Sequence, residues 1–255
     1  MKCLRRDGDS LSARERAGAV SPQLIWIRRD RSLQKDIYSP ALLVPSSGLR
    51  PPFPAIDLEL LRRSGIIDAL PEVNEIHLEG REQAQARGAK LIGTGRAIGV
   101  SPGAAYGTAK RWLPERFAEA ASSIAAKIGA SILVFGSNAE KELCAQVASL
   151  SGGRNLAGTT TLREFIDMTA ACSVYLSNDS GAMHLAAALG VPSVTVFGPT
   201  DETATGPVAA NASLLRQTVE CSPCLKRECP IDHRCMTRVS AEMVAAEAIR
   251  LVSAE

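Results

Sequence analysis

The feature that most constrains this chain is a regular alternation of apolar runs and amphipathic segments from residue 97 onward. Strands are predicted in AIGV (97–100), SILVF (131–135), SVYLS (173–177) and PSVTVF (192–197). Helices are predicted between and after them, at 114–129, 139–150, 161–171, 182–190 and 240–254. Strands that alternate with helices form βαβ units with right-handed crossovers. The sequence therefore predicts an α/β domain built on a parallel sheet.

Four glycine-containing loops follow the predicted strands: SPGAAYG, FGSNAE, SNDSG and FGPTDE. In open parallel sheets, ligands bind beyond the carboxyl ends of the strands. We therefore expect these loops to lie together at one edge of the sheet and to form a binding site.

Residues 1–95 differ from this pattern. They offer only one helical segment at 58–67 and one short strand candidate at 74–78. We therefore expect two parts: a reduced N-terminal region over 1–95 and a Rossmann-like domain over 96–255. With 45% hydrophobic residues, the chain can bury a sizeable core.

The charge is nearly balanced, at +2, which argues against general nucleic-acid binding. Residues 1–35 hold nine basic and four acidic side chains, suited to contact with an anionic membrane surface or simply to a solvated start. No apolar run reaches the ~18 residues that span a bilayer. The first 18 residues lack the apolar core of a signal peptide. We expect a cytoplasmic protein.

The turn SNDSG precedes a predicted helix, whose first N–H groups lack intrahelical partners. Gly181 would let an anion approach the backbone, and Ser180 would add a hydroxyl donor. Asp179, being acidic, should instead accept hydrogen bonds from the loop or from a sugar. The alternative is an ordinary helix cap. His184 follows Ser180 by one helical turn. It could donate a hydrogen bond to a ligand, or it could be a buried core histidine. No nucleophile elbow is present to support a catalytic Ser180–His184 pair.

Two further residues carry charge at the same edge. Lys110 ends the first glycine loop, where its ammonium could neutralise a pyrophosphate or lie in solvent. Glu140 begins a helix, where it could complement the helix dipole or bind ribose hydroxyls. Neither a P-loop nor a G-x-G-x-x-G motif is present, so ATP hydrolysis and hydride transfer lose support.

A late cluster contains Cys221, Cys224, Cys229 and Cys235, with His233 nearby. The opening C-x₂-C is typical of structural zinc sites, although the later spacing is irregular. The alternatives are reduced cysteines that pack a loop, and disulfides.

Several long segments in the same order resemble one family. They are PGAAYGTAKRWLPERFAEAA, NLAGTTTLREF, SNDSGAMHLAAALGVPSVTVFGPTDETATGP and CSPCLKRECPIDHRCM. Together they resemble the ADP-heptose:lipopolysaccharide heptosyltransferases of glycosyltransferase family 9, and within them the heptosyltransferase II group. The resemblance covers about residues 55–255 and is strongest from residue 98.

The resemblance implies a GT-B fold, in which the C-terminal of two Rossmann-like domains binds the nucleotide sugar. It implies inverting transfer of heptose from ADP-heptose to an inner-core sugar of lipid A–core oligosaccharide. No catalytic cofactor is implied, and the enzyme would work in the cytoplasm, either free or at the cytoplasmic face of the inner membrane. By position it assigns Lys110 to the donor phosphates, Glu140 to ribose, Thr160 and Thr161 to the adenine pocket, and Asp179, Ser180, Gly181 and His184 to the donor loop.

The N-terminal region departs from this pattern. Family members begin with a strand, a Gly-Asp turn and a Thr-Pro, and that aspartate is the general base. Gly8-Asp9 has no strand before it and no Thr-Pro after it. Asp9 is therefore not assigned as the base, and no catalytic residue is named. The alternatives are therefore a non-catalytic nucleotide-sugar-binding remnant, another GT-B sugar-processing enzyme such as an epimerase, and a zinc-stabilised interaction module.

Overall fold

The computed structural model describes residues 61–62, 64–66, 68–69 and 75–254. The chain divides into two compact units, Met1–Glu72 and Val73–Glu255, and the second contains the elements below. The boundary expected between residues 95 and 96 lies inside this second unit, because helix α5 (Arg81–Ile92) packs against α8 (Leu162–Ala170). Asp9 and half of the helix expected at 58–67 lie outside the described residues.

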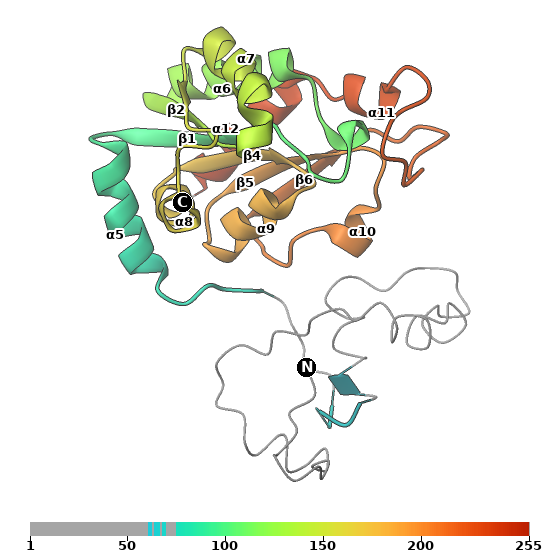
Figure 1. Ribbon diagram of the computed structural model, residues 1–255, viewed down its shortest axis with the longest axis horizontal. Coiled ribbons are helices and arrows are strands. Elements are labelled where there is room, and N and C mark those ends of the chain that lie inside the picture. The colour runs from blue at the N-terminus through green and yellow to red at the C-terminus, as the bar shows by residue number, and fades with distance from the viewer. Residues whose placement is uncertain (1–60, 63, 67, 70–74, 255) are drawn as a thin grey trace. The chain divides into compact units, whose positions relative to one another are not determined.

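A six-stranded parallel sheet forms the centre of the second unit (Figure 1). Its strand order is β3-β2-β1-β4-β5-β6, the doubly wound order of Rossmann-like folds. The expected α/β fold with a parallel sheet is therefore confirmed. The strands are β1 (Arg96–Ser101), β2 (Ala130–Val134), β3 (Arg154–Asn155), β4 (Val174–Asn178), β5 (Ser193–Phe197) and β6 (Ala212–Arg216).

Helices cover both faces of the sheet (Figure 1). One apolar cluster joins the sheet to α6, α7 and α12, and a second joins it to α5, α8 and α9. The remaining elements are η1 (Thr108–Lys110), α6 (Pro114–Ile128), η2 (Asn138–Glu140), α7 (Lys141–Ser151), α9 (Gly181–Ala188), α10 (Glu202–Thr205), α11 (Arg234–Thr237) and α12 (Ala241–Ser253).

The central strands β4 and β5 are buried along their whole length because both of their faces are covered. In β1, Ile98 and Val100 join the cluster under α6, whereas Ala97 joins the cluster under α8. Trp112 and Phe117 anchor the first cluster, with ring centroids 4.9 Å apart in an edge-to-face arrangement. The Trp112 indole donates a hydrogen bond to the Val239 carbonyl at 3.1 Å, so its polar atom is satisfied inside the core.

The strand expected at 74–78 was wrong for the described residues 75–78, which form no strand. Two backbone hydrogen bonds attach this segment to separate parts of the fold. Ile76 N–H donates to Val208 O in the loop after α10, and Leu78 N–H donates to Ala188 O at the end of α9. No ladder follows, since the two acceptors belong to different elements. The sequence analysis also missed β3, β6 and α5, which lack the strong apolar pattern of the central elements.

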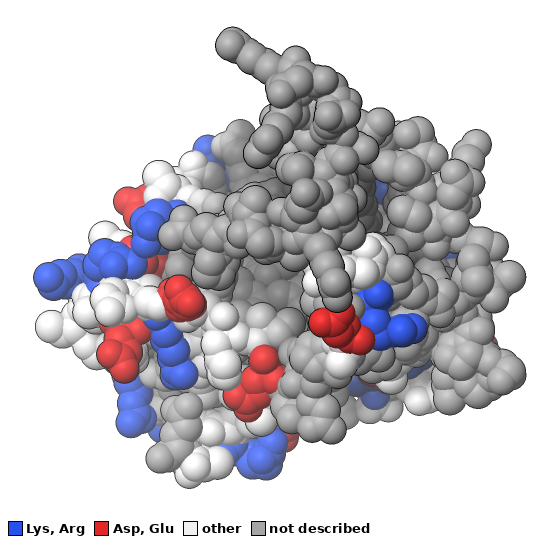
Figure 2. Space-filling view, turned by 90° about the horizontal axis from the view of Figure 1, so that it is seen from below, with Lys and Arg blue, Asp and Glu red and all other residues white. Residues whose placement is uncertain are grey.

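No helix among the described residues has the length and hydropathy needed to cross a bilayer. On the face drawn in Figure 2, the described acidic and basic side chains are interspersed, with no large patch of one sign.

Candidate functional site

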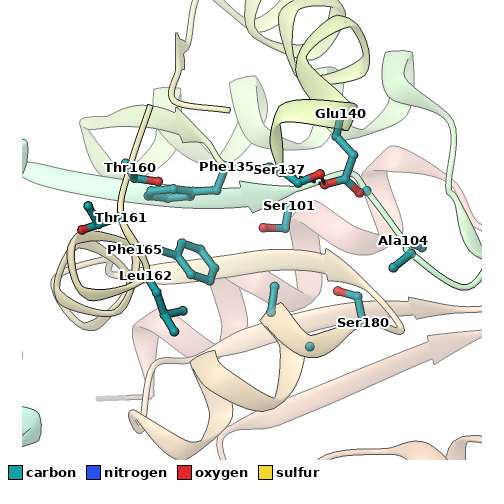
Figure 3. A pocket seen from close by; sticks show the side chains of 15 residues that line it. Ser101, Ala104, Phe135, Ser137, Glu140, Thr160, Thr161, Leu162, Phe165 and Ser180 are labelled. Atoms are coloured by element: carbon teal, nitrogen blue, oxygen red, sulfur yellow. Dashed lines mark hydrogen bonds between the residues drawn. The ribbon is translucent and has the colours of Figure 1, made fainter. Parts of the chain in front are cut away.

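A pocket of about 330 Å³ lies beyond the carboxyl ends of the strands, beside β1 and β4. These two strands are neighbours in the sheet although they are distant in sequence, so the strand order reverses between them. Loops leave such a switch point in opposite directions and open a crevice. The lining, shown in Figure 3, comprises Ser101, Gly103, Ala104, Ala105, Phe135, Gly136, Ser137, Glu140, Thr160, Thr161, Leu162, Phe165, Ser180, Gly181 and Ala182.

One side of the pocket is formed by the N-terminus of α9. Ser180 is its N-cap residue, yet its side chain makes no cap hydrogen bond. The N-cap residues of α8, α10 and α12 (Thr161, Asp201 and Ser240) all do accept such bonds. A Cβ at Gly181 would meet no atom within 4 Å, so the space beside it is open. The end of α9 therefore offers N–H donors, a hydroxyl and a positive dipole end to an anion in the pocket.

Glu140 lies at the opposite side of the pocket (Figure 3). Its Oε2 atom accepts hydrogen bonds from the Ser137 backbone N–H at 2.8 Å and from the Ser137 hydroxyl at 2.7 Å. This capping box at the start of η2 fixes the carboxylate. A Cβ on Gly103 would lie only 1.8 Å from Oε1, so glycine is needed there to make room for Glu140.

Thr160 and Thr161 line the same pocket together with the aromatic rings of Phe135 and Phe165. The two rings meet edge to face, with centroids 5.3 Å apart. Thr161 also caps α8, because its hydroxyl accepts from the Glu164 N–H at 3.2 Å. Thr161 and Glu164 thus form a capping box, and this end of the pocket combines apolar rings with hydroxyls, which suits a planar heterocycle.

Lys110 and Asp179 form a buried ion pair adjoining Ser180 in the chain, with 2.6 Å between Nζ and Oδ2. Their side chains are only 11% and 6% exposed. Oδ2 also accepts hydrogen bonds from the hydroxyls of Thr200 at 2.6 Å and Thr205 at 3.3 Å. Asp179 was expected to accept from loop N–H groups or a sugar; in the structure the Lys110 ammonium neutralises it and two threonine hydroxyls donate to it. An anion at Ser180 therefore meets a balanced pair and not an isolated carboxylate.

Asn178, fully buried at the end of β4, holds the loop that leads from β1 to Lys110. Its side chain accepts from the Trp112 N–H at 2.9 Å and donates to the Pro102 carbonyl at 2.7 Å. Both ends of the loop are thereby fixed against β4. The Asn of the SNDSG turn thus links the loop after β1 to the loop after β4 at the switch point.

His184 is partly buried on α9, one turn after Ser180. Burial lowers the pKa of its imidazole, Lys110 lowers it further, and Asp179 acts in the opposite direction. The ring is therefore neutral at pH 7 and lies within electrostatic reach of the ion pair. A neutral imidazole can donate one hydrogen bond to a ligand oxygen.

Five of the eight predicted donor-site residues line the pocket: Glu140, Thr160, Thr161, Ser180 and Gly181. The other three, Lys110, Asp179 and His184, lie at or beside the buried ion pair. Sequence reasoning missed Ser101, Phe135, Ser137 and Phe165 as lining residues. Strand-end position could have indicated Ser101 and Phe135, whereas Phe165 reads as an ordinary core residue of an amphipathic helix.

The structure adds no support for the zinc alternative at the four clustered cysteines. Among the described residues, no group of three or more His, Cys, Asp or Glu side chains is placed to hold a metal ion. Burial raises the pKa of Cys235, and the nearby Cys221, Cys229 and Cys224 thiols raise it further. All four are free thiols, so the disulfide alternative is absent as well. The arrangement fits reduced cysteines that pack a loop.

Comparison with known proteins agrees with this geometry. The model of glycosyltransferase family 9 (heptosyltransferase) matches residues 63–234. Lipooligosaccharide heptosyltransferase 2 of Campylobacter jejuni is 36% identical over 165 residues, which cover 62% of this chain and 51% of the relative. Lipopolysaccharide heptosyltransferase 2 of Escherichia coli K12 is 38% identical over 125 residues, which cover 47% of this chain and 36% of the relative.

A solved structure, E. coli ADP-heptose lps heptosyltransferase II, superposes with a TM-score of 0.61 at 26% identity, over 75% of this chain and 57% of that one. The chain spans about half the length of the first curated relative and less than half the length of the E. coli relative. The family match covers more than half of this chain and includes the pocket and the buried ion pair. The chain therefore belongs to glycosyltransferase family 9, the heptosyltransferases.

Proposed function

We propose that the protein transfers heptose from ADP-heptose to an inner-core sugar of a lipid A–core oligosaccharide, with inversion at the transferred carbon. The observation that carries this proposal is the uncapped N-terminus of α9, which faces a pocket at the switch point and adjoins the Lys110–Asp179 pair. Family membership and the name of the superposed E. coli enzyme support the choice of ADP-heptose.

The dimensions and chemistry of the pocket support a nucleotide diphosphate sugar. The N–H groups at the start of α9 and the Ser180 hydroxyl would bind the diphosphate, and Lys110 would neutralise it. Glu140 would accept hydrogen bonds from ribose hydroxyls through Oε1, which accepts none from the described residues. Thr160, Thr161 and the aromatic rings would enclose adenine.

The same groups serve the chemistry of transfer. When the bond between heptose and the diphosphate breaks, negative charge increases on the leaving ADP oxygen. Fixed N–H dipoles and an ammonium in a partly enclosed site stabilise such charge without reorganisation. Lys110 has three N–H donors, so it can donate to a phosphate oxygen while it keeps its contact with Asp179. Asp179 then fixes the direction of the ammonium.

The proposal places the reaction in the cytoplasm, at the inner-membrane face where the lipid-linked acceptor would be presented. The basic residues among the first 35 suit contact with that anionic surface. This part of the proposal predicts that the protein sediments with vesicles of anionic phospholipid and that the amount bound falls as the salt concentration rises.

Calorimetry with ADP, UDP and GDP tests donor recognition. We expect selective binding of ADP, weakened about tenfold by Glu140→Ala, because a charged hydrogen bond contributes ~1.5–3 kcal/mol. Glu142→Ala, an exposed change two residues along, is the matched control. Equal binding of the three nucleotides, or no binding by folded protein, would contradict the proposal.

A transfer assay with ADP-heptose and a heptose-deficient core acceptor then tests turnover, by release of ADP. Release that depends on acceptor supports the enzyme. ADP binding without transfer would identify the chain as a nucleotide-sugar-binding remnant of its family.

A further inference from the structure

The backbone that carries Lys110 is held by the cysteine-rich segment, residues 221–235. The Ala109 N–H donates a hydrogen bond to the Arg227 carbonyl at 2.9 Å. The Ala109 carbonyl accepts one from Nε2 of His233 at 2.7 Å, which requires the proton on Nε2. Both polar backbone groups of the residue preceding Lys110 are therefore bound by a segment more than 110 residues away.

The same contact surface extends toward the start of the loop. A Cβ at Gly107 would lie 2.2 Å from the Arg227 carbonyl oxygen, so the two backbones approach as closely as glycine allows. The Tyr106 hydroxyl donates to the Leu225 carbonyl at 3.0 Å. The Tyr106 ring also lies 5.0 Å from the Lys110 ammonium and 5.2 Å from the Arg227 guanidinium, within the range of cation–π attraction.

The segment is anchored in turn to the loop that follows β5. The Leu225 N–H donates to the Pro199 carbonyl at 2.8 Å, and the Ser222 hydroxyl donates to the Gly198 carbonyl. This second loop carries Thr200, whose hydroxyl binds the carboxylate paired with Lys110. The cysteine-rich segment thus connects the two loops whose side chains meet at Asp179.

His233 occupies an unusual backbone position. It precedes α11 with φ of 56° and ψ of 29°, in the left-handed region that few non-glycine residues adopt. Such a conformation persists where surrounding contacts enforce it. Its imidazole binds the Ala109 carbonyl, so the strained position and the long-range hydrogen bond occur in the same residue.

We propose that the cysteine-rich segment positions the Lys110 ammonium for the donor diphosphate, and that His233 is the positioning residue. This inference rests on the proposed function, because it assumes a diphosphate at Lys110. His233 acts through the Ala109 carbonyl and does not touch the ligand. Loss of its imidazole removes the hydrogen bond at the Ala109 carbonyl and leaves η1 less restrained. The position of the Lys110 ammonium is then no longer fixed both by the Lys110 backbone and by Asp179. Small displacements of charged groups in a binding site cause large losses of affinity.

Calorimetry with ADP on the full chain tests the proposal. We expect His233→Ala to raise the Kd about tenfold and His233→Gln, whose amide can donate to the same carbonyl, to recover most of the loss. Gly107→Ala, which disturbs the contact from the other side, should weaken binding to a similar degree. In the background of Lys110→Ala, His233→Ala should cause no further loss, since its effect passes through Lys110. His77→Ala, an exposed histidine remote in sequence from the pocket residues, is the matched control.

Hydrogen exchange over residues 106–112 without nucleotide tests the backbone contact separately. Faster exchange in His233→Ala and in Gly107→Ala, with unchanged circular dichroism, is the expected result. If wild type binds no ADP, the proposed function fails, while the exchange data still judge the backbone contact. If wild type binds ADP and folded His233→Ala binds equally well, or if the two losses multiply in the double variant, the positioning role is refuted.

Discussion

The Lys110–Asp179 pair gives a prediction that separates stability from binding. Lys110→Met removes the ammonium but leaves a carboxylate that is 6% exposed. Breaking a buried pair from one side costs ~3–5 kcal/mol. Because Thr200 and Thr205 still donate to Asp179, we expect the lower end, about 3 kcal/mol. For a domain of this size that corresponds to a fall in Tm of roughly 6–12 °C.

The second replacement should reverse this loss. Asp179→Asn in the Lys110→Met background removes the uncompensated charge, and a neutral pair of similar volume is often as stable as the ion pair. We therefore expect the double variant to unfold within about 1 kcal/mol of wild type. ADP affinity should remain reduced by roughly 10- to 150-fold in both, since the ammonium–phosphate hydrogen bond, worth ~1.5–3 kcal/mol, is absent from both.

Urea unfolding followed by circular dichroism gives the free energies, and calorimetry gives the affinities. Lys127→Met, which removes an exposed lysine from the end of α6, is the control and should change neither. A Lys110→Met protein as stable as wild type would refute the reasoning about burial. A double variant that regains ADP binding would refute the role of the ammonium.

Three other changes test separate features of the structure. Gly88→Ala in α5 should lower the Tm, because its Cβ would lie 1.8 Å from a backbone oxygen of α8, a clash that outweighs the ~1 kcal/mol gain in helix propensity. Gln85→Ala, an exposed change in the same helix, is the control and should not lower the Tm. A Gly88→Ala protein more stable than wild type would contradict the close packing of α5 and α8. Burial lowers the pKa of His184 below its usual 6.5, so the unfolded state binds the proton first and stability falls as the pH drops below about 6.5. His184→Gln should flatten urea-measured stability between pH 7.5 and 5.5, and an unchanged slope would count against burial of the ring. Gly103→Ala should displace the Glu140 carboxylate and weaken ADP binding in calorimetry, with little change in Tm. Unaltered affinity would show that the position of the Glu140 carboxylate does not depend on a glycine at residue 103.

Much of the site could be predicted because its signals are local. A strand followed by a glycine loop and a helix places Ser180 and Gly181 at an anion-binding terminus without any tertiary information. The Thr161–Glu164 capping box was also readable from spacing alone. Edge elements were missed for the opposite reason. Strand β6 is only partly buried, and α5 is mostly polar, with only Ala84 and Gly88 fully buried.

The cysteine-rich segment shows where local signals say too little. Its spacing left zinc, reduced cysteines and disulfides open, and it gave no sign that the segment binds the Lys110 loop through backbone groups and His233. Hydrogen bonds between main-chain atoms leave almost no trace in the identities of the residues that make them. No spacing rule could therefore have indicated that this segment contacts Ala109.

The sequence by itself determined the α/β class, the order of the central elements and most polar residues around the pocket. Periodicity and turn chemistry depend only on residues that are close together in the chain. Only the tertiary structure decided the partners: that Asp179 is neutralised by Lys110, that Asn178 fixes the loop after β1, and that His233 holds η1. These contacts join residues from 66 to 124 positions apart, so they exist only after the sheet has brought β1, β4 and β5 side by side.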